Sequence, residues 1–300
     1  YVLYAVTDQV FCDIAITNKL NYKKYDIYDW KNEFFKYAIK GNNEKSQKYL
    51  AIGICQVLDI ADGITWRSVK DISAVTGIPQ GTSSGKVEPH ISYAEYMGLV
   101  KSEREEKQIK LSRTNLGEII YMEDSGLQEL LTKTLLHAMI LRQENGADMW
   151  SDIFNSIFPK YRNGIKKELL LLELNQLYAN KVTTKNIAPF FGSYDDFFSE
   201  LEILTIQDDV VSCNSLPYDK EFIYMYATVL WKYWDEFYPE QDEISSVQFA
   251  ELGFGKAFGW DLKAEYEVME HLADRGLIRM NRQLMPYTIL KLTTEDELIN

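Results

Sequence analysis

Histidine and cysteine are scarce in this sequence, and their scarcity argues against several kinds of site. The 300 residues include three histidines and three cysteines, each far from the next. Neither a Cys-x-x-Cys nor a His-x-x-x-His pair occurs, so we expect no metal site and no disulfide framework. A nucleotide-binding P-loop is missing too, because Val87 stands where that motif needs a hydroxyl. We therefore expect a protein that is not an enzyme and holds no cofactor.

Long apolar runs are also missing. No stretch of about 18 apolar residues occurs, which argues against a membrane-spanning helix. The opening YVLYAVTDQVF lacks the basic and apolar regions of a secretory signal. Hydrophobic residues nevertheless make up 46% of the chain, enough to fill the cores of two or three compact units. We expect a cytoplasmic protein with no membrane partner.

Basic residues are outnumbered, and the acidic excess is uneven along the chain. The formal net charge is −13, which opposes attraction of the whole surface to DNA. Residues 66–113 differ, because their eight cationic and six acidic side chains give a net charge of +2. The remainder therefore carries −15, and residues 66–113 form the stretch that a phosphate repels least.

The same stretch has the pattern of two helices joined by a polar turn. Apolar residues spaced three apart from Trp66 to Val75 predict a first short helix. The glycine and proline that follow would end this helix. The polar turn Gly81–Gly85 would then lead to a second helix, which begins near Lys86 and ends at Gly98.

A charged hairpin follows the second helix. Leu99 and Val100 would begin one strand, the run SEREEK would form the turn, and residues 108–112 would return as the other strand. Helix, turn, helix and hairpin is the order of a winged helix, whose second helix enters a DNA groove. Many winged helices bind proteins instead, so the order does not determine the function.

Two later stretches repeat this order. Helix ends marked by glycine, and paired aliphatic strands at 203–212 and 277–290, predict two further hairpins. We therefore expect a mainly α protein with small β-hairpins (an α+β fold), in which repeated winged-helix units are joined by a helical middle region. The predicted parts are an N-terminal segment of undetermined structure at 1–44, a first winged-helix unit at 45–113, a helical connector at 114–164, a second unit at 165–213 and a third unit at 220–292.

Four motifs stand out along the chain. They are TGIPxGxSSGKVEPHIxYAxxMGL at 76–99, LGxxIxxED at 116–124, LTxxLLH at 131–137 and GAxxWxxIFNxIF at 146–158. Together they resemble a bacterial domain-of-unknown-function family numbered 4007, over residues 52–292. Phe254 stands where a family turn has proline, and the family's N-terminal His-Glu-Thr-Phe segment is not found. The resemblance implies an accessory protein encoded beside genes for DNA sulfur modification (DNA phosphorothioation) and phage defence.

We predict a DNA-binding accessory protein of such a system, whose partners are double-stranded DNA and proteins of the same system. The alternative is a scaffold whose winged units dock on proteins and never contact nucleic acid, and the charge of −15 outside the first unit favours it. In the DNA-binding interpretation, polar and cationic groups position the protein on the phosphates, and side chains of the second helix read bases or sugars. The residues chosen are Ser84, Lys86, Arg104 and Lys107 for phosphates, and His90, Ser92 and Tyr93 for base edges or sugars.

Overall fold

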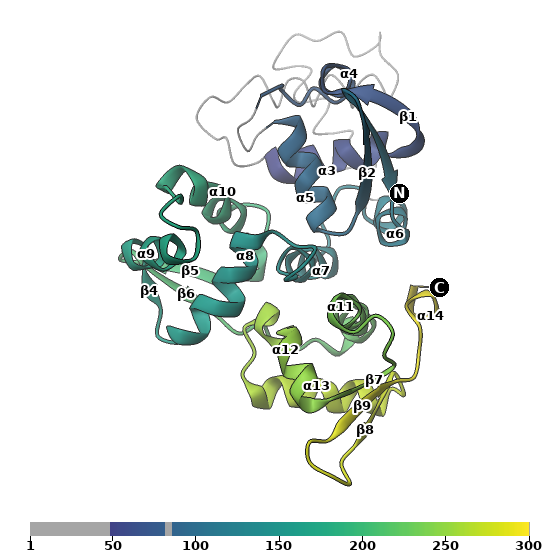
Figure 1. Ribbon diagram of the computed structural model, residues 1–300, viewed down its shortest axis with the longest axis vertical. Coiled ribbons are helices and arrows are strands. Elements are labelled where there is room, and N and C mark those ends of the chain that lie inside the picture. Colours follow the sequence, from purple (N-terminus) through teal and green to yellow (C-terminus); the bar gives the residue numbers. More distant parts are fainter. Residues whose placement is uncertain (1–48, 82–85, 300) are drawn as a thin grey trace, which may run out of the picture.

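A computed structural model describes residues 49–81 and 86–299. Over these ranges the chain is mainly α-helical with three small antiparallel sheets, as the sequence predicted. The expectations for residues 1–44 and for Ser84 lie outside the described residues. Figure 1 shows the three sheets in separate groups of elements, at the top, the left and the bottom of the view.

The first unit has the order helix, strand, helix, helix and two strands. Its elements are α3 (Tyr49–Ile60), β1 (Asp62–Ser68), α4 (Val69–Thr76), α5 (Val87–Tyr96), β2 (Val100–Glu105) and β3 (Gln108–Arg113). The sheet order is β1-β3-β2, and the β2–β3 hairpin closes at the pair Glu105 and Gln108. Gly77 ends α4 in the left-handed conformation (φ 74°), which glycine adopts without strain.

Trp66 was predicted on the first helix of this unit, and that prediction is wrong. Trp66 lies on strand β1 opposite Lys110 of β3, whose ammonium is 5.2 Å from the indole centroid. Helix α4 instead starts after Ser68, whose side chain and that of Asp71 bond each other's backbone N–H groups in a capping box. The capping box, rather than the apolar spacing, marks where this helix begins.

A helical segment connects the first unit to the rest. Its elements are α6 (Asn115–Glu123), α7 (Leu130–Ile140), α8 (Asp148–Asp152), a π-helical turn (Ile153–Ile157) and a 3-10 turn (Phe158–Lys160). Helix α7 is buried from Thr132 to its end and contacts elements of all three units. Leu130 and Leu131 are 46% and 39% exposed. They lie in the first turn, before the helix enters the core.

The second unit repeats the strand arrangement of the first. Its elements are β4 (Ile165–Lys166), α9 (Lys167–Leu177), α10 (Thr184–Asp195), a 3-10 turn (Ser199–Leu201), β5 (Leu204–Gln207) and β6 (Val210–Cys213). The sheet order β4-β6-β5 matches β1-β3-β2. Helix α10 runs unbroken through Gly192 and contains Pro189. Gly192 is buried within this helix.

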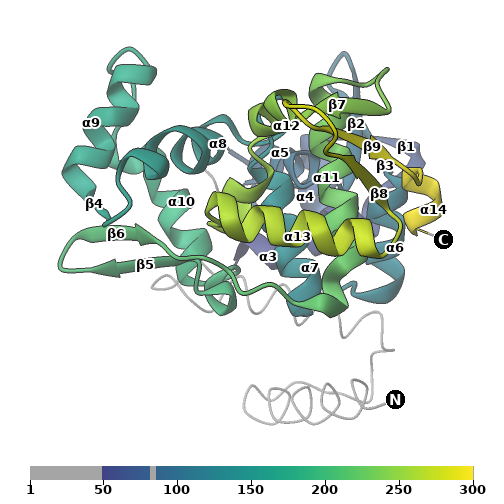
Figure 2. The ribbon, with the colours of Figure 1, turned by 90° about the horizontal axis from the view of Figure 1, so that it is seen from below.

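The third unit has the same arrangement again. Its elements are a 3-10 turn (Lys220–Phe222), α11 (Ile223–Phe237), β7 (Glu243–Ser245), α12 (Ser246–Leu252), a 3-10 helix (Phe254–Phe258), α13 (Leu262–Asp274), β8 (Ile278–Asn281) and β9 (Thr288–Lys291), followed by α14 (Glu295–Ile299). The sheet order is β7-β9-β8. Figure 2 shows the sheets of the second and third units on opposite sides of the molecule. Both later hairpins that the sequence predicted are present.

No helix in the described ranges is both long and apolar enough to cross a bilayer.

Candidate interaction site on the first unit

Helix α5 is the helix that the sequence predicted to face a partner. Its inner face buries Val87, Ile91 and Ala94 against the core of the first unit. The helix begins after Lys86, whose backbone is extended, and Pro89 is tolerated because it lies in the first turn. What α5 offers to a partner therefore depends on its remaining side chains.

His90 is turned into the unit and not outward. It is 2% exposed, and its Nδ1 lies 2.7 Å from the carbonyl oxygen of Lys86, so that nitrogen carries the proton and donates. Its ring packs so closely on α3 that a Cβ atom at Gly53 would fall 2.1 Å from it. His90 is a packing residue, and the structure contradicts the expectation that it reaches a base edge.

The close approach of α3 and α5 gives a stability prediction. Gly53→Ala should lower the free energy of unfolding by about 1–3 kcal/mol, because the new methyl group overlaps the His90 ring. The direction of the change in stability is informative, since alanine in a helix interior is otherwise favoured over glycine by about 1 kcal/mol. Urea unfolding checks it, with Gly126→Ala, whose Cβ would meet Gln128 at 3.5 Å, as a tolerant control. Equal or higher stability of Gly53→Ala would show that the two helices are not in close contact.

The predicted cations lie beside α5, one on the residue just before the helix and two on the hairpin. Arg104 of β2 has its Nη1 3.5 Å from Glu88 Oε1 of α5, and both side chains are about half exposed. Lys107 is exposed in the β2–β3 turn, and Lys86 is half-buried. Exposed ion pairs are worth at most about 1 kcal/mol, so a phosphate can displace Glu88 from Arg104 at little cost.

Carboxylates occupy much of the outer part of α5. Glu88 is exposed, and Glu95 accepts hydrogen bonds from the Ser102 backbone N–H and hydroxyl at 3.1 and 2.6 Å. Lys86 is the nearest cation along the chain, and it precedes the helix. The face of α5 itself is therefore poorly suited to phosphate. The adjoining hairpin offers the exposed Arg104 and Lys107, and Glu103, Glu105 and Glu106 are exposed beside them.

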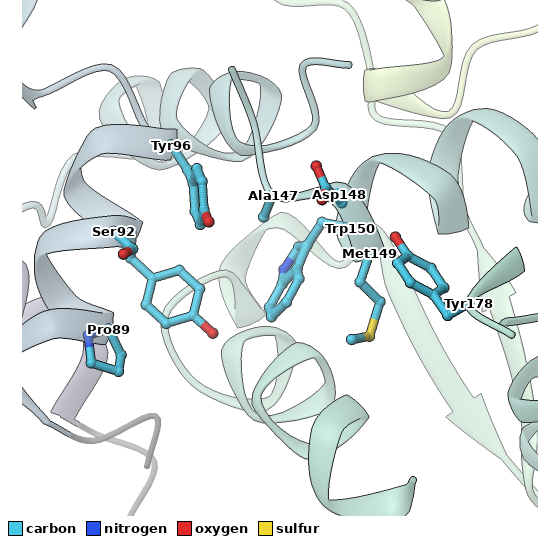
Figure 3. Close-up of a pocket in the computed structure, with 9 residues that line it drawn as sticks. Pro89, Ser92, Tyr96, Ala147, Asp148, Met149, Trp150 and Tyr178 are labelled. Atoms are coloured by element: carbon cyan, nitrogen blue, oxygen red, sulfur yellow. The ribbon is translucent and has the colours of Figure 1, made fainter. Parts of the chain in front are cut away.

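The rest of the outer face of α5 lines a groove shared with α8, here called the α5–α8 groove (Figure 3). Its volume is about 330 Å3. The lining residues are Pro89, Ser92, Tyr93, Tyr96, Ala147, Asp148, Met149, Trp150 and Tyr178. Two residues predicted to contact DNA, Ser92 and Tyr93, thus lie in a concave surface formed with another part of the chain.

Aromatic rings shape this groove. The Tyr93 ring stands edge-on to Trp150 at a centroid distance of 5.7 Å and edge-on to Tyr96 at 6.4 Å. Trp150 is 5% exposed and packs on Phe190 of α10, so its ring is a fixed part of the groove lining. Its Nε1–H has no hydrogen-bond partner among the described residues, which is unusual for a buried donor. Burial raises the pKa of Tyr93 to about 12, so its hydroxyl stays neutral.

No local pattern in the sequence indicates this groove. Trp150 is a core residue, and Tyr178 follows the last residue of α9. The hydroxyl of Tyr178 donates to Asp152 Oδ2 at 2.7 Å, which holds its ring beside α8. The groove arises where α5, α8 and the end of α9 meet, and such tertiary contacts leave no local spacing pattern.

Two features of the chain bear on catalysis. Residues 81–85 have the Gly-x-Ser-x-Gly spacing of a hydrolase nucleophile elbow, but that elbow joins a strand to a helix. Here the segment follows α4, and its residues 82–85 are outside the described ranges. Among residues 49–81 and 86–299, no three His, Cys, Asp or Glu side chains gather as a metal site requires. Neither observation assigns a catalytic role.

Two solved structures share the fold of this chain. The crystal structure of magnesium ion-bound SspB has a TM-score of 0.58 at 13% identity, and the match covers 86% of each chain. The SspB crystal structure has a TM-score of 0.59 at 12% identity, with the same coverage. At this identity the similarity concerns the fold alone. No family model matches the chain, and no curated protein matches it.

Proposed function

We propose that this protein binds double-stranded DNA as a non-enzymatic accessory protein of a bacterial DNA-modification or phage-defence system. The observation that carries the proposal is the first unit, in which α5 lies beside a hairpin with exposed cations, in the order of a winged helix. The biological setting is proposed from the resemblance of four sequence motifs to family 4007, and no family model matches the chain.

The proposed contact is made by the hairpin and the start of α5. Lys86, Arg104 and Lys107 supply the positive charge, and together they would neutralise about three phosphates. Glu88 and Glu95 keep phosphate away from the face of α5. Binding is therefore to the DNA backbone, and sequence selectivity is expected to be low.

Charge reversal tests the contact. Lys86→Glu combined with Arg104→Glu should abolish binding, because each change replaces an attraction to phosphate with a repulsion. The variant should fold normally, since Arg104 is exposed and Lys86 is half-buried at the surface, and surface substitutions usually change stability by about 0.5 kcal/mol. Fluorescence anisotropy with a labelled duplex at low salt measures the affinity, and urea unfolding measures the stability.

A matched control separates a local contact from general electrostatics. Lys181→Glu with Lys185→Glu changes the net charge by the same amount, at exposed lysines of the second unit. This control should retain most of the wild-type affinity. An equal loss in the two double variants would contradict a contact at the first unit. Absence of wild-type binding even at low salt would contradict the DNA-binding function itself.

A second candidate function is docking to a partner protein. The α5–α8 groove favours it, because a concave surface lined by aromatic rings and a few polar groups is typical of ligand and peptide sites. The groove lies on the helix that a winged helix would offer to DNA. The two functions therefore make opposite predictions for substitutions in the groove and on the hairpin.

A further inference from the structure

The lining of the α5–α8 groove is aromatic and acidic. Tyr93 and Tyr96 come from α5, Trp150 from α8 and Tyr178 from the end of α9. Asp148 is the one charged side chain of the lining, it is exposed, and no lysine or arginine is among the lining residues. Figure 3 shows Asp148 beside Trp150, on the same side of the groove as Tyr178.

Carboxylates on more than one element act on the tyrosine rings of the groove. The pKa of Tyr96 is raised by burial first, and then by the carboxylates of Asp148 on α8 and Glu95 on α5. The pKa of Tyr178 is raised by burial, by its hydrogen bond to Asp152, and by the charges of Asp152 and Asp148. A group that makes a tyrosinate harder to form also repels a phosphate and attracts a cation.

The faces of aromatic rings attract cations for a separate reason. The ring quadrupole places negative potential over each face, and arginine and lysine are the usual partners in proteins. The chain uses such contacts elsewhere, with Lys291 4.8 Å from the Trp234 ring and Arg113 4.1 Å from the Tyr121 ring. In the groove the rings have an acidic neighbour in Asp148 but no cation in the lining.

We propose that the α5–α8 groove binds an arginine side chain presented by an extended segment of a partner protein. The guanidinium would lie against Tyr96 and Tyr93 and pair with Asp148. The proposal rests on the protein-docking function and names the chemistry of its partner.

The test uses the full chain and two labelled peptides. One is a short Gly-Arg repeat, and the other has citrulline at every arginine, which keeps the shape and removes the charge. Fluorescence anisotropy should show that the arginine peptide binds about tenfold more tightly than the citrulline peptide. Equal affinity for the two peptides would overturn the cation proposal while leaving protein docking in place. Absence of binding by both peptides would overturn the cation proposal and count against protein docking at this groove.

Groove variants locate the binding. Asp148→Asn and Tyr96→Leu should each lower the affinity for the arginine peptide by about fivefold. Asp208→Asn removes the same charge from the exposed β5–β6 turn and should leave the affinity unchanged. Equal effects of Asp148→Asn and Asp208→Asn would show general attraction to an acidic protein and would overturn the proposal. Asp148→Asn is isosteric and keeps the test decisive if Tyr96→Leu does not fold.

Duplex DNA binding by the groove variants shows whether the groove is a nucleic-acid site. The proposal predicts that Tyr96→Leu leaves DNA binding unchanged, because the DNA contact uses the hairpin. If Tyr96→Leu weakened DNA binding while Asp148→Asn strengthened it, the groove would be a nucleic-acid site and the peptide proposal would be wrong. If the hairpin variants did not affect DNA binding, the result would count against the DNA-binding function and would leave the peptide proposal in place.

Discussion

Replacing Arg142 with methionine is expected to lower the free energy of unfolding by about 3–5 kcal/mol. Arg142 and Glu236 form a buried ion pair, with Nη1 3.0 Å from Oε1 and side chains 8% and 4% exposed. Arg142 also donates from Nε to the Met139 carbonyl and from Nη2 to the Tyr96 carbonyl. It thereby joins the end of α7 to α5 of the first unit and to α11 of the third. The variant would leave the Glu236 carboxylate buried without its cation.

Urea unfolding measures this effect, and two further variants interpret it. Arg162→Met removes an exposed arginine and should cost less than about 0.5 kcal/mol. The double variant Arg142→Met with Glu236→Met should recover part of the loss, because no unpaired charge remains buried. A loss below about 1 kcal/mol in Arg142→Met would show that the pair does not hold the units together.

Acid is expected to destabilise this protein in part through His137. This residue of α7 is fully buried, its Nε2–H donates to the Ala257 carbonyl at 2.8 Å, and its Nδ1 accepts from the Tyr194 hydroxyl at 3.1 Å. Burial lowers its pKa to about 4, partly opposed by the hydrogen bond to Ala257. The neutral ring thus connects α7 to the second and third units.

The sign of the pH effect follows from proton linkage. An unfolded histidine titrates near pH 6.5, so between about pH 6.5 and 4 the unfolded state binds more protons than the folded state. Stability from this group is complete above pH 6.5 and is lost as the pH falls towards 4. A difference of about 2.5 pKa units corresponds to about 3 kcal/mol.

Comparison of variants isolates this contribution from that of the many carboxylates. His137→Gln should be less stable at pH 7, since a buried hydrogen bond is lost or weakened, but it should lose less stability between pH 7 and 4.5 than the wild type. His271→Gln, at an exposed histidine, should keep the wild-type pH dependence. Urea unfolding at the two pH values measures both, and parallel losses in His137→Gln and wild type would contradict a buried neutral histidine.

Much of the fold could be predicted because its hairpins and longer helices have local signals. Paired aliphatic residues around a polar turn indicated all three hairpins. The first strand of each sheet was missed, because β4 has two residues and β7 has three. β1 was mistaken for helix, because Trp66 is three residues from Val69 and six from Ile72. Short edge strands depend on a partner strand far along the chain, which local spacing does not reveal.

The candidate site was predicted in part. The position of α5 and the exposed cations Arg104 and Lys107 followed from local patterns. The burial of His90 did not follow from a local pattern. Gly53 within an apolar helix was nevertheless a usable sign that another element packs closely there. The groove could not be predicted, because Trp150 reaches α5 through the packing of a separate helix.

The salt dependence of DNA binding tests the central claim most directly, namely that the hairpin and the start of α5 contact phosphates. Three cations at the contact predict a slope of about −2.7 in log Kobs against log salt concentration. Replacing Lys86 and Arg104 with alanine removes two of the three contacts without adding repulsion, so the remaining binding should have a slope near −0.9. The account predicts this reduction, measured by anisotropy with a labelled duplex over a series of salt concentrations. A slope unchanged by the double substitution, or a wild-type protein that binds no duplex at low salt, would contradict it.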